Sequence, residues 1–523
     1  MNDEKMLAGT HPEGEREIAE RGTVEALSLD TFGGKIQLRW EPDAAVSSLG
    51  QMPFFIEFLK TSGLFEEWVE ECPLKYTSPN APAKRDVLGT ILLSVLSGHW
   101  RYAHISALRG DGVNPELLGM TKVASEDSVR RALSALNEEE STPWLKKHLK
   151  ASYEPLLEEP WALDMDTTVK VLYGHQEDAK VGYNPQKPGR PSHAYHSYCI
   201  GNLRLVMDVE VQAGNQTASS FAQPEFWALL DGLPKLSLPT FLRGDCGWGN
   251  EQAMKGAEQR QIPYLFKLKQ SANVKKLIVT LLGNEQWVEA GQNWQGLEAE
   301  LQLSGWSQPR HVVVLRRPLP QPVEEEKKKK KSKKKTAKQL RLDLPEAMYR
   351  GILYEYAVLV TTLKDEIRTL AQHYRDRGDS ENNFDELKNQ WGWGGFTTHD
   401  RKRCQVMARI TALVYNWWNI FMRLAIPDKH AEAITSRPLA LHGIARRIRH
   451  SGQTTIEVTS THSKASLIAQ ALTNVSAFLK RIKQTAEQLT NPTRWSLILS
   501  AAFQHFLRGK VLGSTLRLSE AAS

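Results

Sequence analysis

The sequence predicts an α/β protein with a mixed central sheet and helical regions at both ends of the chain. Residues 161–173 alternate between polar and apolar side chains and are rich in β-branched residues, which indicates a strand. Residues 240–269 follow the order strand, acid, turn, helix, strand. Residues 53–74 and 85–100 instead have the apolar spacing of helices, as does much of 426–523.

Composition sets limits on the class of protein. The 523 residues exceed one ordinary domain, and 41% apolar content is enough for sizeable cores. The net charge of +7 favours an anionic partner, although one lysine run supplies part of it. Four cysteines stand far apart without a Cys-x-x-Cys pair, which argues against a disulfide framework or a structural zinc site.

The localisation expected from the sequence is cytoplasmic. The N-terminus is polar and lacks the apolar core of a signal peptide. The longest apolar stretch, Ile410 to Ile426, is interrupted by Asn416, Asn419 and Arg423, so we do not expect it to span a membrane.

Residues 1–150 are predicted to form a mostly helical DNA-binding region. The segment 124–133 has the pattern of a capped helix, with Ser125 or Asp127 as the N-cap. Arg130 and Arg131 project from its first turns, and the short helices before it are typical of a helix-turn-helix DNA reader. A helical packing subdomain with surface arginines is the alternative.

Residues 160–270 and 350–425 are predicted to form the α/β core, and two of its strands carry acids. Asp164 and Asp166 are two residues apart, so both would point to one face of the 161–173 strand. Asp245 follows the strand at 240–244, at the strand end where open α/β sheets place their ligands.

Residues 271–349 are predicted to be a β-rich insertion of irregular strands that holds Trp287, Trp294 and Trp306. Within it, residues 324–338 form a lysine-rich loop with eight lysines among the nine residues 327–335. Like charges at that density repel one another, so we expect a disordered loop. It either touches DNA phosphates without sequence preference or merely aids solubility. Residues 426–523 are expected to be mainly helical.

One polar stretch carries a distinctive spacing. If residues 374–388 form one α-helix, Tyr374, Arg377 and Lys388 lie within about 40° of Glu381 around its axis. A carboxylate can hold a metal, and the cations can hold phosphates. The alternative to a functional site is a solvent-exposed helix face on which Arg377 and Glu381 form an ion pair one turn apart.

Asp166, Asp245 and Glu381 are three isolated acids that could bind the metal ions used in phosphoryl transfer on DNA. Two Mg²⁺ ions, about 3.5–4 Å apart, can stabilise the charge that develops on the attacking and leaving oxygens. Carboxylates are the ligands such hard ions prefer.

These residues resemble the three blocks of DDE insertion-sequence transposases. The blocks are Asp166-Thr-Thr168, Arg243-Gly-Asp-Cys-Gly-Trp-Gly-Asn250, and the Tyr374, Arg377, Glu381, Lys388 pattern. The pattern is that of the Tyr-Arg-Glu-Lys branch, which carries a β-strand insertion between the second Asp and the Glu. The gaps of 79 and 136 residues agree with that order. The resemblance covers roughly residues 160–425 and implies a ribonuclease-H-like catalytic core.

The resemblance also implies roles for the named residues. Asp166, Asp245 and Glu381 would bind two Mg²⁺ ions, for which Mn²⁺ can substitute. Arg377 and Lys388 would hold DNA phosphates near the cut, and Tyr374 would contact the DNA end. One of the three insertion tryptophans would stack on a flipped base. Asp164 competes with Asp166 for the metal, and only the Asp-Thr-Thr block favours Asp166.

The function implied is cut-and-paste transposition in a bacterial cytoplasm, at the nucleoid when bound to DNA. A metal-dependent cleavage at the transposon ends would be followed by 3′-hydroxyl strand transfer into double-stranded target DNA, with a dimer as the active complex. Two alternatives stay open: a catalytically silent, transposase-derived DNA-binding protein, and a ribonuclease-H-like nuclease without strand transfer.

Overall fold

The computed structural model describes residues 26–41, 44–76, 78–184, 187–319, 348–349, 352–427, 430–459, 462–485 and 489–513. The chain divides into two compact units, Met1–Ala45 and Val46–Ser523. Within the first unit, β1 (Leu27–Thr31) and β2 (Gly34–Leu38) form an antiparallel hairpin. Every predicted site residue belongs to the second unit.

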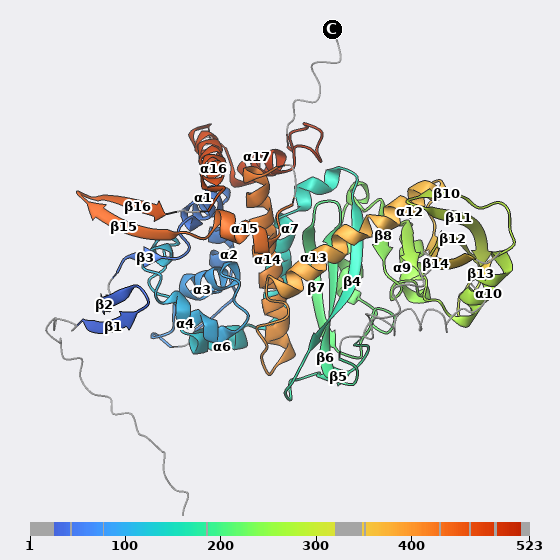
Figure 1. Ribbon diagram of the computed structural model, residues 1–523, viewed down its shortest axis with the longest axis horizontal. Helices are drawn as coiled ribbons and strands as arrows, with labels where there is room; N and C mark the ends of the chain where they lie inside the picture. Colours follow the sequence, from blue (N-terminus) through green and yellow to red (C-terminus); the bar gives the residue numbers. More distant parts are fainter. Residues whose placement is uncertain are drawn as a thin grey trace, which may run out of the picture. The chain divides into compact units, whose positions relative to one another are not determined.

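A mixed sheet of eleven strands is the centre of the second unit (Figure 1). Its main path runs β10–β11–β12–β14–β9–β8–β4–β6–β5, while β7 pairs with β6 and β13 pairs with β14. The core strands are β4 (Ala162–Val171), β5 (Lys180–Val181), β6 (Pro191–Ile200), β7 (Leu205–Ala213), β8 (Phe241–Gly244), β9 (Tyr264–Lys267) and β14 (Ile352–Thr361). β4 is parallel to β8 and antiparallel to β6. The prediction of a mixed α/β fold is confirmed.

The strands of the insertion extend this same sheet. They are β10 (Val288–Gly291), β11 (Trp294–Leu301), β12 (Arg310–Pro318) and β13 (Met348–Tyr349). β12 pairs with β14, and β14 pairs with β9 of the core. The expectation of strands from residue 271 onward is wrong at its start, because Ala272–Leu281 is helix α10. The lysine-rich loop 324–338 lies outside the described residues.

A long helix, α14 (Arg401–Ala425), lies between the sheet and the N-terminal helices (Figure 1). Its amide side chains satisfy the outer backbone groups of β7, which pairs with β6 alone. The Asn416 carboxamide bonds both N–H and C=O of Val206 at 2.8 Å, and Gln405 bonds Val211 N and Val209 O. Unpaired strand edges are costly to bury, so these residues allow a helix to close this side of the sheet.

The N-terminal helices form one apolar core with the central sheet and α14. They are α1 (Met52–Ser62), α2 (Leu64–Glu70), α3 (Lys84–Leu96), α4 (Ile105–Leu108), α5 (Asn114–Leu117), α6 (Glu126–Ala135) and α7 (Glu138–Ala151), with short 3₁₀ turns at Tyr102–His104 and Glu154–Glu158. Trp68 stacks on Trp144 with centroids 5.7 Å apart and meets Trp417 of α14 edge-on. Ser125 is the N-cap of α6, as one of the two predicted alternatives, and accepts a hydrogen bond from Ser128 N.

The remaining helices flank the sheet and the C-terminal region. They are α8 (Pro224–Asp231), a 3₁₀ turn at Lys235–Ser237, α9 (Glu251–Gln259), α12 (Ile367–Arg375), α13 (Arg377–Asn389), α15 (Ala433–Ala440), α16 (Ala465–Thr485) and α17 (Asn491–Ala502). In the part of the chain described, no helix is both long and apolar enough to cross a membrane.

The C-terminal region contains strands as well as helices. β15 (Ile444–His450) and β16 (Gln453–Thr459) form a hairpin, and β15 also pairs with β3 (Val46–Ser47). The first and last regions of the second unit therefore share one small sheet.

Candidate active site

The first two predicted acids lie level on neighbouring strands. β4 and β8 run parallel, with Asp164 opposite Arg243 and Met165 opposite Gly244. The next residues in this register are Asp166 and Asp245, on strands that are about 4.8 Å apart. The sheet therefore brings together two acids separated by 79 residues of sequence.

The turn after β8 fixes the position of Asp245. Its Oδ1 accepts a hydrogen bond from Gly247 N at 2.9 Å, and its carbonyl accepts one from Trp248 N. A Cβ on Gly244 would come within 2.7 Å of the Trp248 side chain, so the strand can end against this buried ring only with glycine there. Asn250 then caps α9 by accepting a hydrogen bond from Ala253 N at 3.1 Å.

The third acid, Glu381, projects from α13, which crosses the sheet next to β4 (Figure 1). The expectation that one helix carries Tyr374, Arg377, Glu381 and Lys388 is wrong in one respect. Tyr374 belongs to α12, and a turn at Asp376 separates α12 from α13. Gly378, a weak helix former, lies two residues after Asp376. The other three residues share α13.

Arg377 joins two of the acids. Its guanidinium contacts Asp166 Oδ1 at 3.1 Å and also pairs with Glu381 one helical turn away. The arginine is buried, whereas the Glu381 side chain is 62% exposed. The Arg377–Glu381 ion pair of the alternative interpretation therefore does form. It does not lie on the solvated face of an isolated helix, because Arg377 also contacts Asp166. It reaches across to the sheet.

Asp164, the alternative metal ligand, uses its carboxylate for hydrogen bonds within the protein. Its carboxylate is buried and accepts two hydrogen bonds from Arg243, at 2.5 and 2.7 Å. Ser380 of α13 donates a further hydrogen bond to it. A Cβ on Gly201 would overlap Asp164 Oδ2, so glycine leaves room for this carboxylate. Asp164 thus links β4, β8 and α13, and Asp166 is the acid of this strand that stays partly open.

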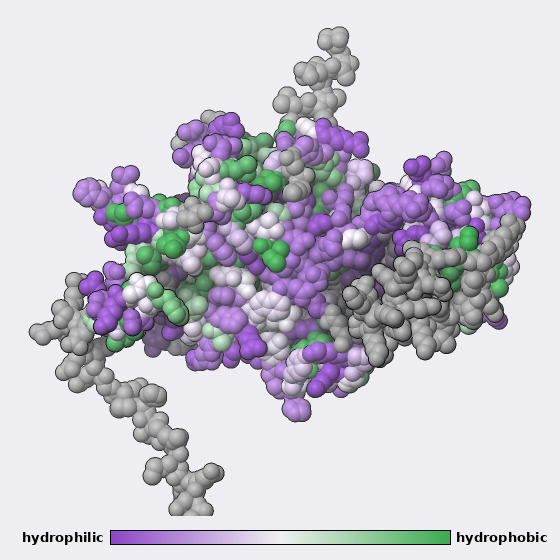
Figure 2. Space-filling model, in the orientation of Figure 1, coloured by the Kyte–Doolittle hydropathy of each residue, from purple (hydrophilic) through white to green (hydrophobic). Residues whose placement is uncertain are grey.

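The charged and phenolic groups of the site influence one another's pKa values. Burial raises the pKa of Asp166 to about 6, Arg377 lowers it, and the neighbouring Asp245 and Glu381 raise it. Burial also raises the pKa of the Tyr374 phenol, which interacts with Arg377, Asp245 and Glu381. Burial lowers the pKa of Lys388, which interacts with Asp166. The surface over α12 and α13 is mainly hydrophilic (Figure 2).

Residues that sequence reasoning missed hold α13 in place. The buried Glu386 carboxylate accepts hydrogen bonds from Trp391 Nε1, His430 Nε2 and Ala433 N at 2.7–2.9 Å. Asn383 accepts a hydrogen bond from Tyr415 of α14. Nothing in the sequence spacing identifies these distant partners of Glu386.

The predicted DNA-contacting residues outside α12 and α13 lie at two other places. On α6, the half-buried Arg130 lies 5.4 Å over the Tyr102 ring, and Arg131 pairs with Asp127 at 2.6 Å. In the insertion, an arginine guanidinium lies over the ring of each tryptophan. The distances from the guanidinium carbon to the ring centroid are 3.9 Å for Arg316 over Trp287, 4.9 Å for Arg317 over Trp294 and 5.2 Å for Arg310 over Trp306. The structure does not bring these residues to the three acids.

The carboxylates fit a hard divalent cation by their donor chemistry. Asp166, Asp245 and Glu381 offer only oxygen ligands. In the described ranges, no three His, Cys, Asp or Glu side chains stand close enough to form a ready-made metal site. The Arg377 guanidinium spans Asp166 and Glu381 and supplies the positive charge between them.

The two histidines of the β6 strand belong to the core. His193 Nε2 bonds the Glu177 carbonyl at 2.7 Å, and His196 Nε2 bonds the Gln216 carbonyl at 2.9 Å. Both side chains are buried. One ring nitrogen of each histidine is thus bonded to a backbone carbonyl.

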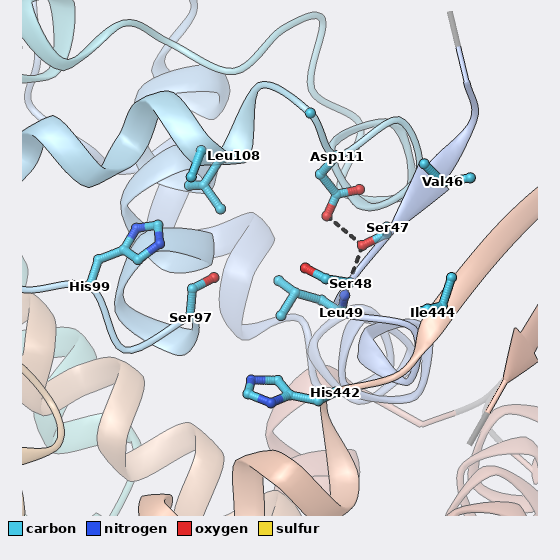
Figure 3. Close-up of a pocket in the computed structure, with 12 residues that line it drawn as sticks. Val46, Ser47, Ser48, Leu49, Ser97, His99, Leu108, Asp111, His442 and Ile444 are labelled. Atoms are coloured by element: carbon cyan, nitrogen blue, oxygen red, sulfur yellow. Dashed lines mark hydrogen bonds between the residues drawn. The ribbon is translucent and has the colours of Figure 1, made fainter. Parts of the chain in front are cut away.

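A cavity of about 470 Å³ lies away from the acids, between β3, the α4–α5 segment and β15 (Figure 3). His99, Asp111 and His442 contribute polar groups to it. Asp111 accepts hydrogen bonds from Ser47, from the Asn114 side chain and from two backbone N–H groups. Its carboxylate is therefore satisfied internally and serves the junction between the two ends of the second unit.

Comparison with known proteins identifies the family. The model of the family described as transposase DDE domain group 1 matches residues 81–480. No curated protein matches the chain. Among solved structures, the chain is similar to a cryo-EM structure of the piggyBac transposase synaptic complex with hairpin DNA, at 10% identity. That match covers 90% of this chain and 88% of the other, and its TM-score is 0.36, so we draw no conclusion from it. The family match, in contrast, spans most of the chain, and this protein therefore belongs to the DDE transposases of domain group 1.

Proposed function

We propose that this protein is the transposase of an insertion sequence, and that it cuts DNA at the ends of its element and joins the freed 3′-hydroxyl to target DNA. The observation that carries the proposal is that Arg377 pairs with Asp166 and Glu381 and interacts electrostatically with Asp245. The gap between the second Asp and the Glu holds strands β10–β12, as expected for the Tyr-Arg-Glu-Lys branch. The mixed sheet with two acids on neighbouring strands agrees with a ribonuclease-H-like core.

In this proposal, Asp166, Asp245 and Glu381 hold two Mg²⁺ ions, or Mn²⁺ in their place. When bound, these ions supply positive charge for the oxygens that become more negative during phosphoryl transfer. Arg377 and Lys388 hold DNA phosphates beside the acids, and Tyr374 contacts the DNA end. Since Arg377 now neutralises Asp166 and Glu381, its guanidinium is within reach of a phosphate that enters the site.

Positioning of the acids is the task of the surrounding chain. Asp164 and Arg243 lock β4 to β8, so Asp166 and Asp245 stay level. Ser380 and Glu386 fix α13 from two sides, which limits where Glu381 can reach. An active complex with two element ends implies at least a dimer, acting on chromosomal DNA in the bacterial cytoplasm.

The test uses a plasmid that carries the coding sequence between its natural flanking DNA. We expect Asp166→Asn, Asp245→Asn and Glu381→Gln to abolish Mg²⁺-dependent cleavage while DNA binding stays within a few-fold of wild type. The matched control is Asp385→Asn, an exposed acid on α13 whose side chain accepts a hydrogen bond from Asn389. Cleavage that survives one of the three substitutions removes that residue from the catalytic set.

A second assay separates transposition from simple nuclease action. Pre-cut ends with a free 3′-hydroxyl are incubated with a target plasmid and Mg²⁺, and joined products are counted. A transposase yields joined products, a nuclease without strand transfer does not, and a silent DNA-binding relative neither cuts nor joins.

A further inference from the structure

The tip of the hairpin formed by β4 and β6 is an exposed surface of aromatic and basic side chains. Tyr173 and Tyr183 are 68% and 73% exposed. Lys180, Lys187 and Arg190 are exposed beside them. We call these five residues the hairpin tip. It lies beyond the end of β4, the strand that carries Asp166, at the lower edge of the sheet in Figure 1.

Contacts within the hairpin tip hold the cations at the surface. The Tyr173 ring has Lys187 Nζ at 5.0 Å and the Arg190 guanidinium at 5.7 Å from its centroid. The Lys187 ammonium also donates a hydrogen bond to the Tyr173 hydroxyl. In the described part of the chain, neither cation forms an ion pair with a carboxylate. Both charges are therefore available to an anionic partner.

The acids of the same segment are directed away from this surface. Asp178 pairs with Arg401 at 2.8 Å, and Glu177 accepts a hydrogen bond from Arg401 N at 3.0 Å. Arg401 begins α14. The segment thus separates its charges, with the carboxylates bound at the start of α14 and the cations outside. Such a separation produces a local positive field that the modest net charge of the chain does not reveal.

A basic cavity connects the hairpin tip with α6. It has a volume of about 380 Å³ and is lined by Arg130, His175, His399 and Arg403, among others. His175 follows the hairpin tip residue Tyr173 by two positions, and Arg130 is the half-buried arginine of α6. Arg403 pairs with Asp400, and Arg130 rests over Tyr102. The cavity therefore has basic side chains both from the segment next to the hairpin tip and from the helix that the sequence predicts to contact DNA.

We propose that the hairpin tip binds backbone phosphates of duplex DNA about 7 base pairs from the phosphodiester that is cut. The inference rests on the proposed function and adds a second DNA contact to it. β4 ends at Val171, and Tyr173 lies two residues beyond it. The seven residues from Asp166 to Tyr173 therefore span up to about 23 Å, at about 3.3 Å each. Base pairs rise by about 3.4 Å, so this span equals about 7 of them. Spaced cations around an exposed ring suit a phosphate backbone better than an apolar protein surface.

The first test measures how binding depends on salt. Fluorescence anisotropy with a 30-base-pair duplex of arbitrary sequence, at 50–300 mM NaCl, compares wild type with the double variant Lys187→Glu/Arg190→Glu. Each lost phosphate contact reduces the slope of log K against log salt by about 0.9. We expect the slope to fall by nearly 2 and the affinity at the lowest salt to drop at least tenfold.

The matched control is Lys60→Glu/Lys480→Glu, which makes the same charge change at exposed positions of α1 and α16. We expect its slope to stay near that of wild type, with unchanged circular dichroism for both variants. Equal slopes for the two double variants would overturn the proposal and would point to a protein partner for the hairpin tip instead.

The second test measures where the contact lies. Hydroxyl-radical footprinting on DNA that the wild-type protein cuts should show protection about 7 base pairs from the cut, and the hairpin-tip variant should lose this protection alone. Protection that persists in the variant overturns the proposal. If the protein fails to cut any DNA, the proposed function fails, whereas the salt dependence still decides whether the hairpin tip binds phosphates.

Discussion

Arg377 shows how much one side chain determines at this site. Without a cation, Asp166 and Glu381 would repel each other and Asp245 across a partly buried space. The guanidinium pairs with the first two and lowers the pKa of Asp166 against the effect of burial. One residue thus opposes the effect of burial on the pKa of Asp166.

Replacing Arg377 should shift the pH dependence of catalysis. In Arg377→Gln, the pKa of Asp166 loses the influence that lowers it and should rise above its value of about 6. An arginine neighbour typically lowers an Asp pKa by about 1–3 units. We therefore expect the acid limb of the cleavage profile, at subsaturating Mg²⁺, to move up by about 1 pH unit or more. The control Arg368→Gln changes an exposed arginine of α12 and should leave the midpoint in place.

A second buried acid, Glu210, should control stability near neutral pH. Burial raises the pKa of Glu210 to about 7, against an ordinary value of 4.5, although the Tyr198 hydroxyl donates a hydrogen bond to it. The folded state therefore binds this proton more tightly than the unfolded state. Its stabilising contribution is complete below about pH 4.5 and is lost as pH rises through 7.

Glu210→Gln keeps the acceptor for Tyr198 and removes the titration. Between pH 5 and 8, wild type should lose about 3 kcal/mol of unfolding free energy more than the variant does. Urea unfolding at both pH values measures the difference, and Glu300→Gln, at an exposed position, is the control. Identical pH dependence for Glu210→Gln and wild type would contradict a proton on this carboxyl.

Helix α13 is the element on which the third acid depends. Ser380 ties it to β4, Asn383 ties it to α14, and Glu386 ties it to the start of α15. The exposed Glu381 is therefore carried on a helix whose buried side is fixed by polar contacts with three other elements.

Loss of the Glu386 anchor should weaken the whole site. Glu386→Ala leaves three buried donors, including the Trp391 indole and His430, without their acceptor. Breaking such a buried network typically costs about 3–5 kcal/mol. We expect a loss of that size in urea unfolding and a fall in cleavage. Asp385→Ala, at the exposed neighbour, should change stability by less than about 0.5 kcal/mol. A Glu386→Ala protein as stable as wild type would show that α13 is held by packing alone.

Elements with a clear period could be predicted from the sequence, and contacts between distant residues could not. The alternation of β4 and the cap at Ser125 are local signals. The choice between Asp164 and Asp166 depends on Arg243, 79 residues beyond Asp164, so strand spacing alone leaves it open. Helix α10 stands where irregular strands are expected: Val274 and Ile278 are β-branched, but their spacing of four is helical.

At the scale of the whole molecule, regions that the sequence separates share their interior. Trp68 of the N-terminal helices packs on Trp144 and on Trp417 of α14, and α14 closes the edge of the central sheet. The small sheet of β3, β15 and β16 joins both ends of the second unit. The insertion strands are bonded to the core through β14.

This continuity predicts one cooperative unfolding transition for the second unit, despite its length. Tryptophan fluorescence reports on the shared core, and far-ultraviolet circular dichroism reports on all helices. The two urea curves should coincide, and calorimetric and van't Hoff enthalpies should agree. Two separate transitions would show that the N-terminal helices or the insertion fold independently.

The pairing of β3 with β15 has a consequence for synthesis of the protein. About 400 residues separate the two strands, and ribosomes add about 5–20 residues per second. A nascent chain must therefore wait roughly 20–80 seconds before its first strand of the second unit meets its partner. During that interval the edge of β3 is open, and a chain that terminates early never closes it. Only a chain translated through β15 can complete this junction.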